Sequence, residues 1–387
     1  MRSIILLSAA TLVSASATLR AEPPTLPQAQ SAQPWVEPQD SAMAISDPDQ
    51  YAWRLFVALN WPASAAPGIA DSAKPLGSTG DTVWESWKNA NEVFLVDGAD
   101  PGPWSGGTKP AIRSFREFDT RARQLQLRDA MLGKQKLFFD PQTSPQGGNE
   151  TRMNRAAYEF ITTNDLFNLD GQRALAKRGD LTITFPPAAK EIKAQWRAIT
   201  AADKPRYHWT EVRNSDGTTS IFGLTALHVI SKDLPNWFWA TFEHVDNPTL
   251  PNNAKWELPS NDTFGCKGQK PDCNRVPAGM GLEGTAWANY RLRGTQVDFA
   301  TSRGGATLLA NSQPEGPFQK TSSCITCHSR ATVAATGRAL DIFKPNGDGY
   351  VGPVDPTWFK QPNGSSKYVQ FDFVWSLTRA QPKAMKK

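Results

Sequence analysis

The chain has 387 residues and a formal net charge of +5, with 42 Lys and Arg against 37 Asp and Glu. This length is sufficient for one large or two ordinary domains with substantial cores. The sequence holds no long block of basic residues, so its charge does not indicate a nucleic acid or a membrane surface as partner. The 30 prolines, 28 glycines and 14 tryptophans are typical of long loops around an aromatic-rich core.

The first residues have the pattern of a secretory signal. A positive charge at Arg2 precedes the apolar run 4–13, and small residues follow up to a cleavage site at Ala17 or Ala21. The apolar run is too short to span about 30 Å of hydrocarbon, and no later stretch approaches the length of a membrane helix. We therefore expect residues 1–21 to be a signal peptide, and the mature protein to lie in the periplasm without a membrane span.

The rest of the chain divides into a short tether and one large unit. Residues 22–45 are rich in Pro, Gln, Ala and Ser and predict a flexible or wrapping tether. Residues 46–387 are expected to form a single globular unit. Its first helix opens at Asp47 and Pro48, an N-cap and N1 pair, and ends before Trp61.

The spacing of apolar, charged and turn residues predicts further elements in chain order. The first half contains a helix after Asp81 with Val83, Trp84 and Trp87, loops at 97–111 and 141–150, a charged helix at 112–132, a helix from 153 to 164, a strand at 181–185, and a helix at 188–200 with Ile192, Trp196 and Ile199 on one face. The second half contains a hairpin of 207–213 and 218–224, a strand at 287–299, a helix at 331–343, and a closing segment at 368–380 that packs its aromatic residues near the cofactor site.

A pentapeptide near the C-terminus is the strongest chemical signal in the sequence. Cys324, Cys327 and His328 form the sequence Cys-x-x-Cys-His, the attachment pattern for c-type haem. The two thiols can bond the two vinyl groups of one porphyrin, and the adjacent imidazole can bind its iron. The sequence therefore predicts one covalent haem c with His328 as proximal iron ligand.

Two other chemistries share part of this pattern. A thioredoxin-like redox pair would need a βαβ context, and half a zinc site would need a second pair of ligands. The remaining thiols, Cys266 and Cys273, are too widely spaced for a zinc knuckle. In an oxidising compartment they predict a structural disulfide instead.

The other three histidines, His208, His228 and His244, fall within one aromatic stretch of the sequence. One of them is expected at the haem, either as sixth iron ligand or as a distal residue that handles protons. His228 is the first candidate because it lies in an apolar, strand-like run, and His244 is the second. Met280 is a further candidate for the sixth ligand. The alternative for each histidine is an ordinary half-buried residue that is hydrogen-bonded to backbone.

Two weaker patterns accompany these. Arg291, Arg293 or Arg330 is a candidate partner of a haem propionate, and a solvated arginine is the alternative. Residues 344–355 partly match an EF-hand loop, but Lys344 occupies the first ligand position, where it would repel calcium. We interpret this loop as a plain turn.

The segments LHVISK, WFWATFEHVDNP, NYRLRGTQVDF and SSCITCHSRA together resemble exported bacterial single-haem proteins of the cytochrome c family. The resemblance covers most of the mature chain and implies haem c, iron binding and electron transfer, with Cys324 and Cys327 as thioether sites and His328 as axial ligand. This chain is larger than small cytochromes, carries its motif late, and lacks a well-placed methionine downstream of it.

We expect an α+β protein with mixed helices, short antiparallel strands and long loops, in which a mainly helical C-terminal segment (318–387) binds the haem. The predicted function is that of a periplasmic electron-transfer cytochrome with a redox protein partner. The alternative is a haem-dependent oxidoreductase of peroxidase or oxygenase type, with a small-molecule substrate and a distal histidine. A haem-based sensor is a third class, but the sequence contains no recognisable output segment.

Overall fold

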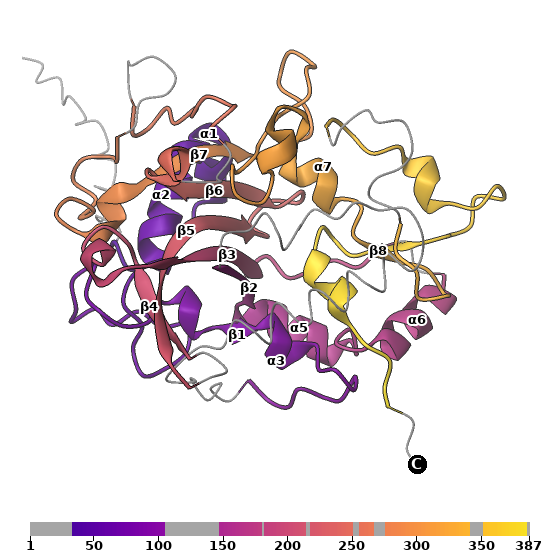
Figure 1. Ribbon diagram of the computed structural model, residues 1–387. Helices are drawn as coiled ribbons and strands as arrows, with labels where there is room; N and C mark the ends of the chain where they lie inside the picture. Colours follow the sequence, from indigo (N-terminus) through magenta and orange to yellow (C-terminus); the bar gives the residue numbers. More distant parts are fainter. Residues whose placement is uncertain are drawn as a thin grey trace, which may run out of the picture. The chain divides into compact units, whose positions relative to one another are not determined.

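A central antiparallel sheet organises the protein (Figure 1). The computed structural model describes residues 33–104, 147–179, 182–213, 217–250, 255–266, 275–340 and 351–384. The sheet has seven strands in the order β1-β2-β3-β5-β6-β7, and β4 pairs with β5 beside this path. The strands are β1 Lys88–Asn89, β2 Gly147–Met153, β3 Lys190–Ile199, β4 Trp209–Arg213, β5 Thr219–Ser231, β6 Phe238–His244 and β7 Tyr290–Gln296.

Alternation along the strands gives this sheet two chemically different faces. Ile192 of β3 pairs with Val229 of β5, which pairs with Ala240 of β6, and these three apolar side chains share one face. Successive residues of a strand point to opposite faces, so the next row, Lys193, His228 and Thr241, lies on the other. We call the first the α2 face and the second the motif face.

Helix α2, Pro48–Leu59, packs on the α2 face. The Asp47 side chain accepts a hydrogen bond from the Gln50 amide and caps the helix, as expected for an N-cap before a proline at N1. Rings of the helix meet the sheet directly, since Phe56 lies 4.3 Å from Phe242 between ring centroids. The predicted helix is confirmed, and it supplies the main contact to the first hydrophobic core.

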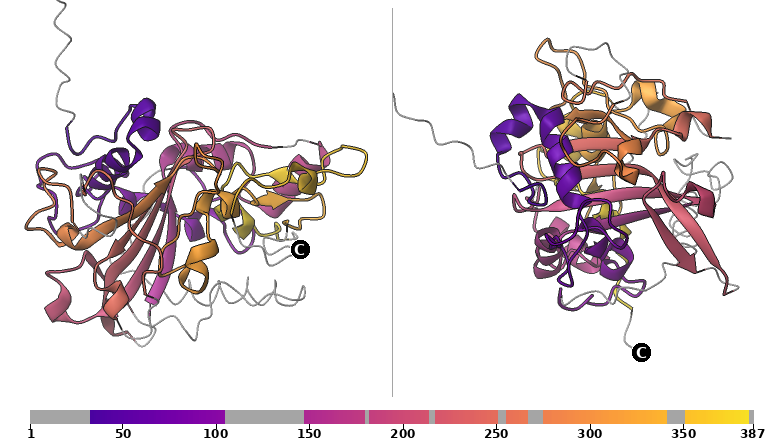
Figure 2. Two further views of the ribbon diagram at one scale, coloured as in Figure 1. Left: turned by 90° about the horizontal axis from the view of Figure 1, so that it is seen from above. Right: turned by 90° about the vertical axis from the view of Figure 1, so that its left-hand side faces the viewer.

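The motif face carries a second hydrophobic core, which includes Ile230, Trp239 and Ile325. The left view of Figure 2 shows α1 and α2 on one side of the strands and the C-terminal segment on the other. The remaining helices are α1 Ser41–Ser46, α3 Ala90–Val93, α5 Arg155–Thr163, α6 Leu169–Lys177 and α7 Cys324–His328. The short 3-10 helices are η1 Trp84–Ser86, η2 Ala201–Asp203, η3 Asn247–Thr249, η4 Ala286–Asn289, η5 Gly316–Thr321, η6 Pro356–Phe359 and η7 Trp375–Arg379.

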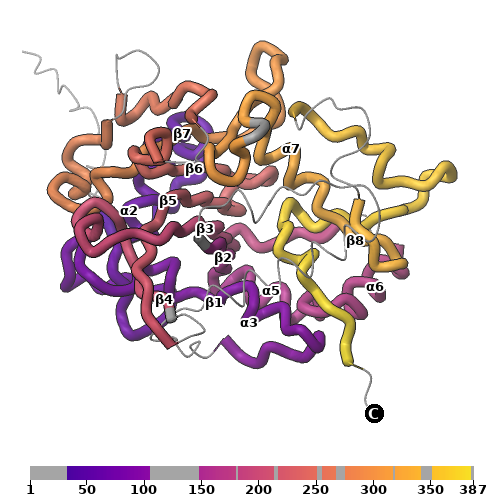
Figure 3. The backbone as a smooth tube through the Cα atoms, in the orientation of Figure 1, coloured from indigo at the N-terminus to yellow at the C-terminus, as the bar shows by residue number. Residues whose placement is uncertain are grey.

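This mixture of helices and a mainly antiparallel sheet is an α+β fold, as predicted. The C-terminal segment differs from its prediction, because its described residues are mostly loop around α7, η6, η7 and a two-stranded sheet of β8 Thr332–Val333 and β9 Val369–Gln370. Figure 3 shows this segment, in orange and yellow, running from α7 past β8 to the C-terminus. Upstream, α1 and the ring of Trp35 pack with the unit that begins at Pro34, so the last part of the predicted tether packs on the protein.

Several local predictions were correct. The helix predicted from 153 to 164 is α5, which Asn154 caps by accepting a hydrogen bond from the Ala157 amide. The predicted hairpin is formed by β4 and β5, although its turn at 214–216 lies outside the described residues. The strand predicted at 287–299 contains β7. The charged helix predicted at 112–132 also lies outside the described residues.

Other predictions were wrong, and the largest error concerns 188–200, which forms strand β3 and not a helix. Ile192, Ala194 and Trp196 are buried at every second position, and this period of two outweighs the helical spacing of Ile192, Trp196 and Ile199. Three smaller predictions were also wrong. The segment 83–87, predicted as a helix, forms only a 3-10 turn. The described part of the predicted strand, 182–185, makes one isolated bridge, and the described part of the predicted helix at 331–343 holds β8 and a turn. Helix α6 was not predicted, and residues 147–150, predicted as part of a loop, belong to strand β2.

Candidate functional site

The last residue of β7 fastens the pentapeptide to the motif face. The side-chain oxygen of Gln296 accepts a 3.0 Å hydrogen bond from the Ile325 amide, and its nitrogen donates a 2.7 Å bond to the Ser323 hydroxyl. Ser323 is also the N-cap of α7, where its hydroxyl accepts from the Thr326 amide. The first turn of α7 is thus both capped and tied to the sheet, which fixes where the cysteines begin.

The two cysteines of the motif stand one helical turn apart in α7. Neither is in a disulfide, and both are partly buried. Side chains three residues apart lie on the same side of a helix, so both thiols are presented together. Burial raises the pKa of both thiols, that of Cys327 to about 11. A thioredoxin-like pair has a lowered thiol pKa, so this environment does not favour that alternative.

His328 is held by a backbone carbonyl and an aromatic edge. Its Nδ1 lies 2.8 Å from the carbonyl oxygen of Phe373, which can only accept, so Nδ1 carries the proton. Burial lowers the pKa of His328 to about 4, and the neutral ring therefore presents an unprotonated Nε2. The ring also packs edge-on to Trp239, with centroids 4.6 Å apart. A fixed Nδ1–H and an available Nε2 are the usual arrangement of a metal-binding histidine.

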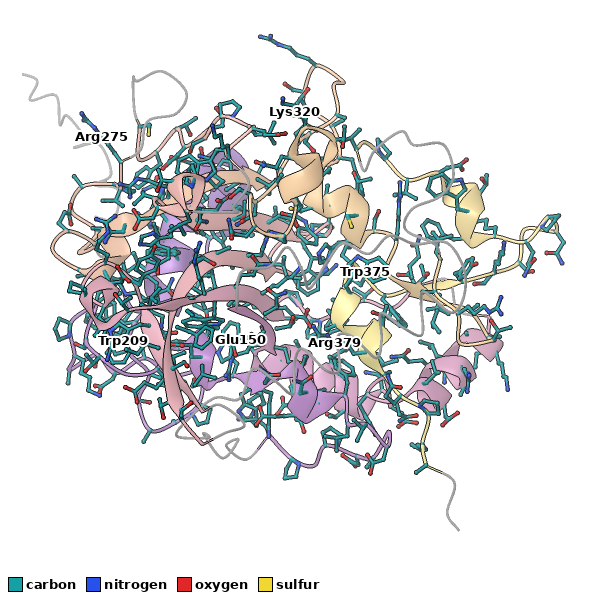
Figure 4. All side chains as sticks on the ribbon, viewed as in Figure 1. Glu150, Trp209, Arg275, Lys320, Trp375 and Arg379 are labelled. Atoms are coloured by element: carbon teal, nitrogen blue, oxygen red, sulfur yellow. The ribbon has the colours of Figure 1, made fainter. Side chains whose placement is uncertain are left out.

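The carbonyl of Cys327 has a partner in the C-terminal segment. The indole Nε1 of Trp375, on η7, donates to this oxygen over 3.1 Å, and Figure 4 labels Trp375. The closing segment therefore contacts the motif through Trp375 and the Phe373 carbonyl, and its packing against a haem stays a prediction.

His228, the first candidate from the sequence, lies on the motif face. It stands on β5, between Lys193 of β3 and Thr241 of β6. Its Nε2 is buried and has no hydrogen-bond partner, and the Glu315 carboxylate lies 3.8 Å away, beyond hydrogen-bond distance. Burial lowers the pKa of His228 well below its usual value, and the cation of Lys193 acts in the same direction. The ring is thus neutral.

Two charged residues near the motif were missed by the sequence analysis. Burial raises the pKa of Glu315 to about 7, although the cation of Lys193 acts in the opposite direction. Glu315 also accepts a 2.8 Å hydrogen bond from the Asn311 amide. Recognising β3 as a strand would have aligned Lys193 with His228, but no sequence pattern marks Glu315.

The other two histidines lie away from the motif. Nε2 of His208 donates to Glu85 over 2.8 Å, and the ring stacks on Trp287 within the first core. In His244, Nε2 donates to the Arg206 carbonyl over 3.0 Å and Nδ1 accepts from the Asp246 amide over 3.2 Å. Both nitrogens of His244 are therefore already engaged.

Of the remaining candidates, Met280, Arg291 and Arg293 come from other parts of the chain, whereas Arg330 follows α7 directly and its backbone amide donates to the Cys327 carbonyl over 3.3 Å. Met280 packs against the first core, on the other side of the sheet. Arg291 donates to the carbonyls of Ala288 and Tyr290, while the guanidinium groups of Arg293 and Arg330 lie over tryptophan rings, at 3.9 Å from Trp256 and 5.1 Å from Trp358. The propionate roles of these arginines stay predictions.

Several sequence predictions fall on residues outside the described ranges. Cys266 is buried, but Cys273 is not among the described residues, so their disulfide stays a prediction. The same holds for the signal peptide at 1–21 and for most of the EF-hand-like loop. Asp355, at its end, caps η6 by accepting from the Thr357 amide.

Two further findings concern metals and membranes. No group of three or more His, Cys, Asp and Glu side chains among the described residues is arranged to hold a metal ion. No helix in the same part of the chain is long and apolar enough to cross a membrane.

Comparison with known proteins adds no family to this description. No protein-family model, no curated protein and no solved structure matches the chain. The resemblance to exported single-haem cytochromes therefore stays a prediction that rests on the motif and its surroundings.

Proposed function

We propose that this chain is a periplasmic c-type cytochrome that carries one haem, bound covalently through Cys324 and Cys327, and transfers electrons to or from a protein partner. The observation that carries the proposal is the 2.8 Å hydrogen bond from His328 Nδ1 to the Phe373 carbonyl. It leaves Nε2 for the iron, next to two thiols that are not in a disulfide. Haem c needs this donor set of two thiols and one neutral imidazole.

His228, near the motif, also fits a bound haem. The buried Nε2 of His228 has no hydrogen-bond partner, and a buried unsatisfied nitrogen costs about 1–3 kcal/mol. A ligand-binding role on the motif face would satisfy it. His228 is accordingly our candidate for the sixth ligand, in place of His244 and Met280.

Within this proposal the haem supplies the one-electron chemistry, and the chain holds the histidine ligand in place and excludes charge from its surroundings. His328 would bind the iron through Nε2, and the Phe373 carbonyl keeps its ring in one orientation. Trp239 restricts the ring from the side. Burial of both histidines in their neutral form keeps additional charge out of a region where the dielectric constant is low.

A second candidate function is a haem-dependent oxidoreductase of peroxidase or oxygenase type. The observation that favours it is the Glu315 carboxylate 3.8 Å from His228 Nε2. A carboxyl group and an imidazole so placed can pass a proton with a small adjustment. In this case His228 would act as proton acceptor near an exchangeable position, and the partner would be a small-molecule substrate.

The first experiment is mass spectrometry of protein produced in a host competent for cytochrome c assembly. We expect the mass of the mature chain plus one haem. The double variant Cys324→Ser/Cys327→Ser should lose the added mass, whereas the matched variant Cys266→Ser/Cys273→Ser should retain it. A wild-type protein without haem would contradict the proposal.

Ferric and ferrous absorption and EPR spectra, with and without CO, then separate the two candidate functions. A six-coordinate, low-spin iron that does not bind CO supports electron transfer. A high-spin iron that binds CO supports the oxidoreductase and counts against a simple carrier.

A further inference from the structure

The carbonyl group that holds His328 belongs to an unusual turn. The Val374 amide donates to the Phe371 carbonyl over 2.9 Å, closing a four-residue turn. Its two central residues, Asp372 and Phe373, have φ of 47° and 70°. Two successive positive φ values define a type I′ turn, which favours Asn-Gly and Asp-Gly because other side chains are strained there. Asp372 is tolerated in this conformation, but Phe373 is not a residue that such a turn prefers.

Buried contacts of the Asp372 carboxylate hold this turn. One oxygen accepts a 2.7 Å hydrogen bond from Lys232 Nζ, and the other accepts a 2.8 Å bond from the Phe185 amide. The side chains of Asp372 and Lys232 are each 8% exposed, so solvent screens their attraction little. The carboxylate thus joins the turn to the end of β5 and to the loop before β3.

Lys232 is fixed by its own backbone position and by a second hydrogen bond. It follows Ser231, the last residue of β5, and its Nζ also donates to the Pro235 carbonyl over 2.7 Å. Breaking a buried ion pair from one side leaves the other charge uncompensated. Loss of Lys232 would therefore release Asp372 and, with it, the restraint on the Phe373 carbonyl.

We propose that Asp372 is a positioning residue for His328. Its ion pair with Lys232 fixes the turn at 371–374. The Phe373 carbonyl of this turn accepts the hydrogen bond from His328 Nδ1. This inference rests on the proposed function, in which His328 binds haem iron. A well-aligned bond to Nδ1–H makes an imidazole a stronger donor to its metal, which favours the ferric state. Loosening the turn should therefore raise the reduction potential.

The variant Lys232→Met separates positioning from direct electrostatics. Removing a nearby positive charge would by itself lower the reduction potential. Loss of positioning raises it, so the two explanations predict opposite signs. We expect the midpoint potential of Lys232→Met to rise, and that of Asp372→Asn to rise as well. Asp355→Asn, at an exposed acid of the same segment, is the matched control and should leave the potential unchanged.

A double-mutant cycle gives a second, independent test. Phe373→Gly creates Asp-Gly, the pair that a type I′ turn prefers, and it keeps the backbone carbonyl. In this background the turn depends less on Lys232, so we expect Lys232→Met to shift the potential less than it does in the wild type. A pure charge effect would give equal shifts in both backgrounds.

Haem content, measured by mass for every protein, keeps the two failures distinguishable. Wild-type protein without haem would contradict the proposed function. Haem-loaded wild type with an unchanged or lowered potential in Lys232→Met would overturn the positioning role of Asp372. If Lys232→Met does not fold, Lys232→Gln, which keeps a donor without the charge, takes its place with the same expected sign.

Discussion

Gln296 and Ile325 join the last strand of the sheet to the first turn of α7: the Gln296 side-chain oxygen accepts a hydrogen bond from the Ile325 backbone amide over 3.0 Å. The same side chain donates to Ser323, and it is 3% exposed. An amide that loses such a partner in a buried position is left without solvent to replace it.

The variant Gln296→Ala should therefore destabilise the protein. Leaving buried groups unsatisfied costs about 1–3 kcal/mol, and because α7 would also lose its anchor, we expect less haem per chain. Chemical denaturation and mass spectrometry measure these effects. Gln361→Ala, at an exposed position, is the matched control, and equal behaviour of the two variants would contradict this role of Gln296.

His228 and His244 give a matched pair of buried histidines. His228→Ala should change the absorption and EPR spectra of the iron, because we place its Nε2 at the site. His244→Ala should leave both spectra unchanged but lower stability by roughly 1–3 kcal/mol, since two hydrogen-bond partners lose their ring nitrogen. A wild-type spectrum in His228→Ala would contradict the placement of His228 at the iron.

Stability should fall in mild acid because of His244. Burial lowers the pKa of His244 to about 4 in the folded protein, whereas an unburied histidine has a pKa of 6.5. Between these values the unfolded chain binds a proton that the folded chain does not, so stability is lost as the pH falls from 6.5 to 4. The difference corresponds to about 3 kcal/mol. Denaturation curves from pH 7 to 4 should show this loss in wild type, and His244→Phe should show less of it.

Glu191 should act in the opposite direction. Burial raises its pKa to about 7 from 4.5, although the hydrogen bond from Ser376 acts against this shift. The folded chain therefore retains a proton longer than the unfolded chain, and the contribution of Glu191 to stability declines as the pH rises from 4.5 through 7. Glu191→Gln keeps an acceptor for Ser376, and we expect it to stabilise by roughly 3 kcal/mol at pH 8 and hardly at pH 4. An equal gain at both pH values would show that burial of the charge is not its cause.

Capping residues mark the helix starts of this fold in the sequence. Asp47 and Pro48 define the start of α2 because capping depends on a few adjacent residues, and Asn154 does the same for α5. The segment 188–200 was misread because Ile192 and Trp196 satisfy both a helical spacing and a period of two. Only pairing with β2 and β5 decides between them, and pairing is a property of distant segments.

The site was predictable to a similar degree. The pentapeptide predicted Cys324, Cys327 and His328 as the haem site, and the apolar run around His228 made it the first candidate among the other histidines. The structure places His228 on the motif face, and the roles of all four residues at a haem stay predictions. By contrast, nothing in the sequence shows that His244 points to the face opposite the motif, or that Glu315 approaches His228. The role of the Phe373 carbonyl was equally hidden, because positive φ values at Asp and Phe leave no pattern in the sequence.

Strand β5 carries His228 within its ladder and ends directly before Lys232, the partner of Asp372. The position of His228 is thus set directly by the backbone pairing of β5, and that of His328 depends on the end of the same strand through Lys232, Asp372 and the Phe373 carbonyl. Such pairing resists gradual deformation because a register slip would turn every side chain to the other face. Under the proposed function, we expect such a frame to move little when an electron arrives or leaves. A low reorganisation energy would then be the main contribution of the sheet to electron transfer.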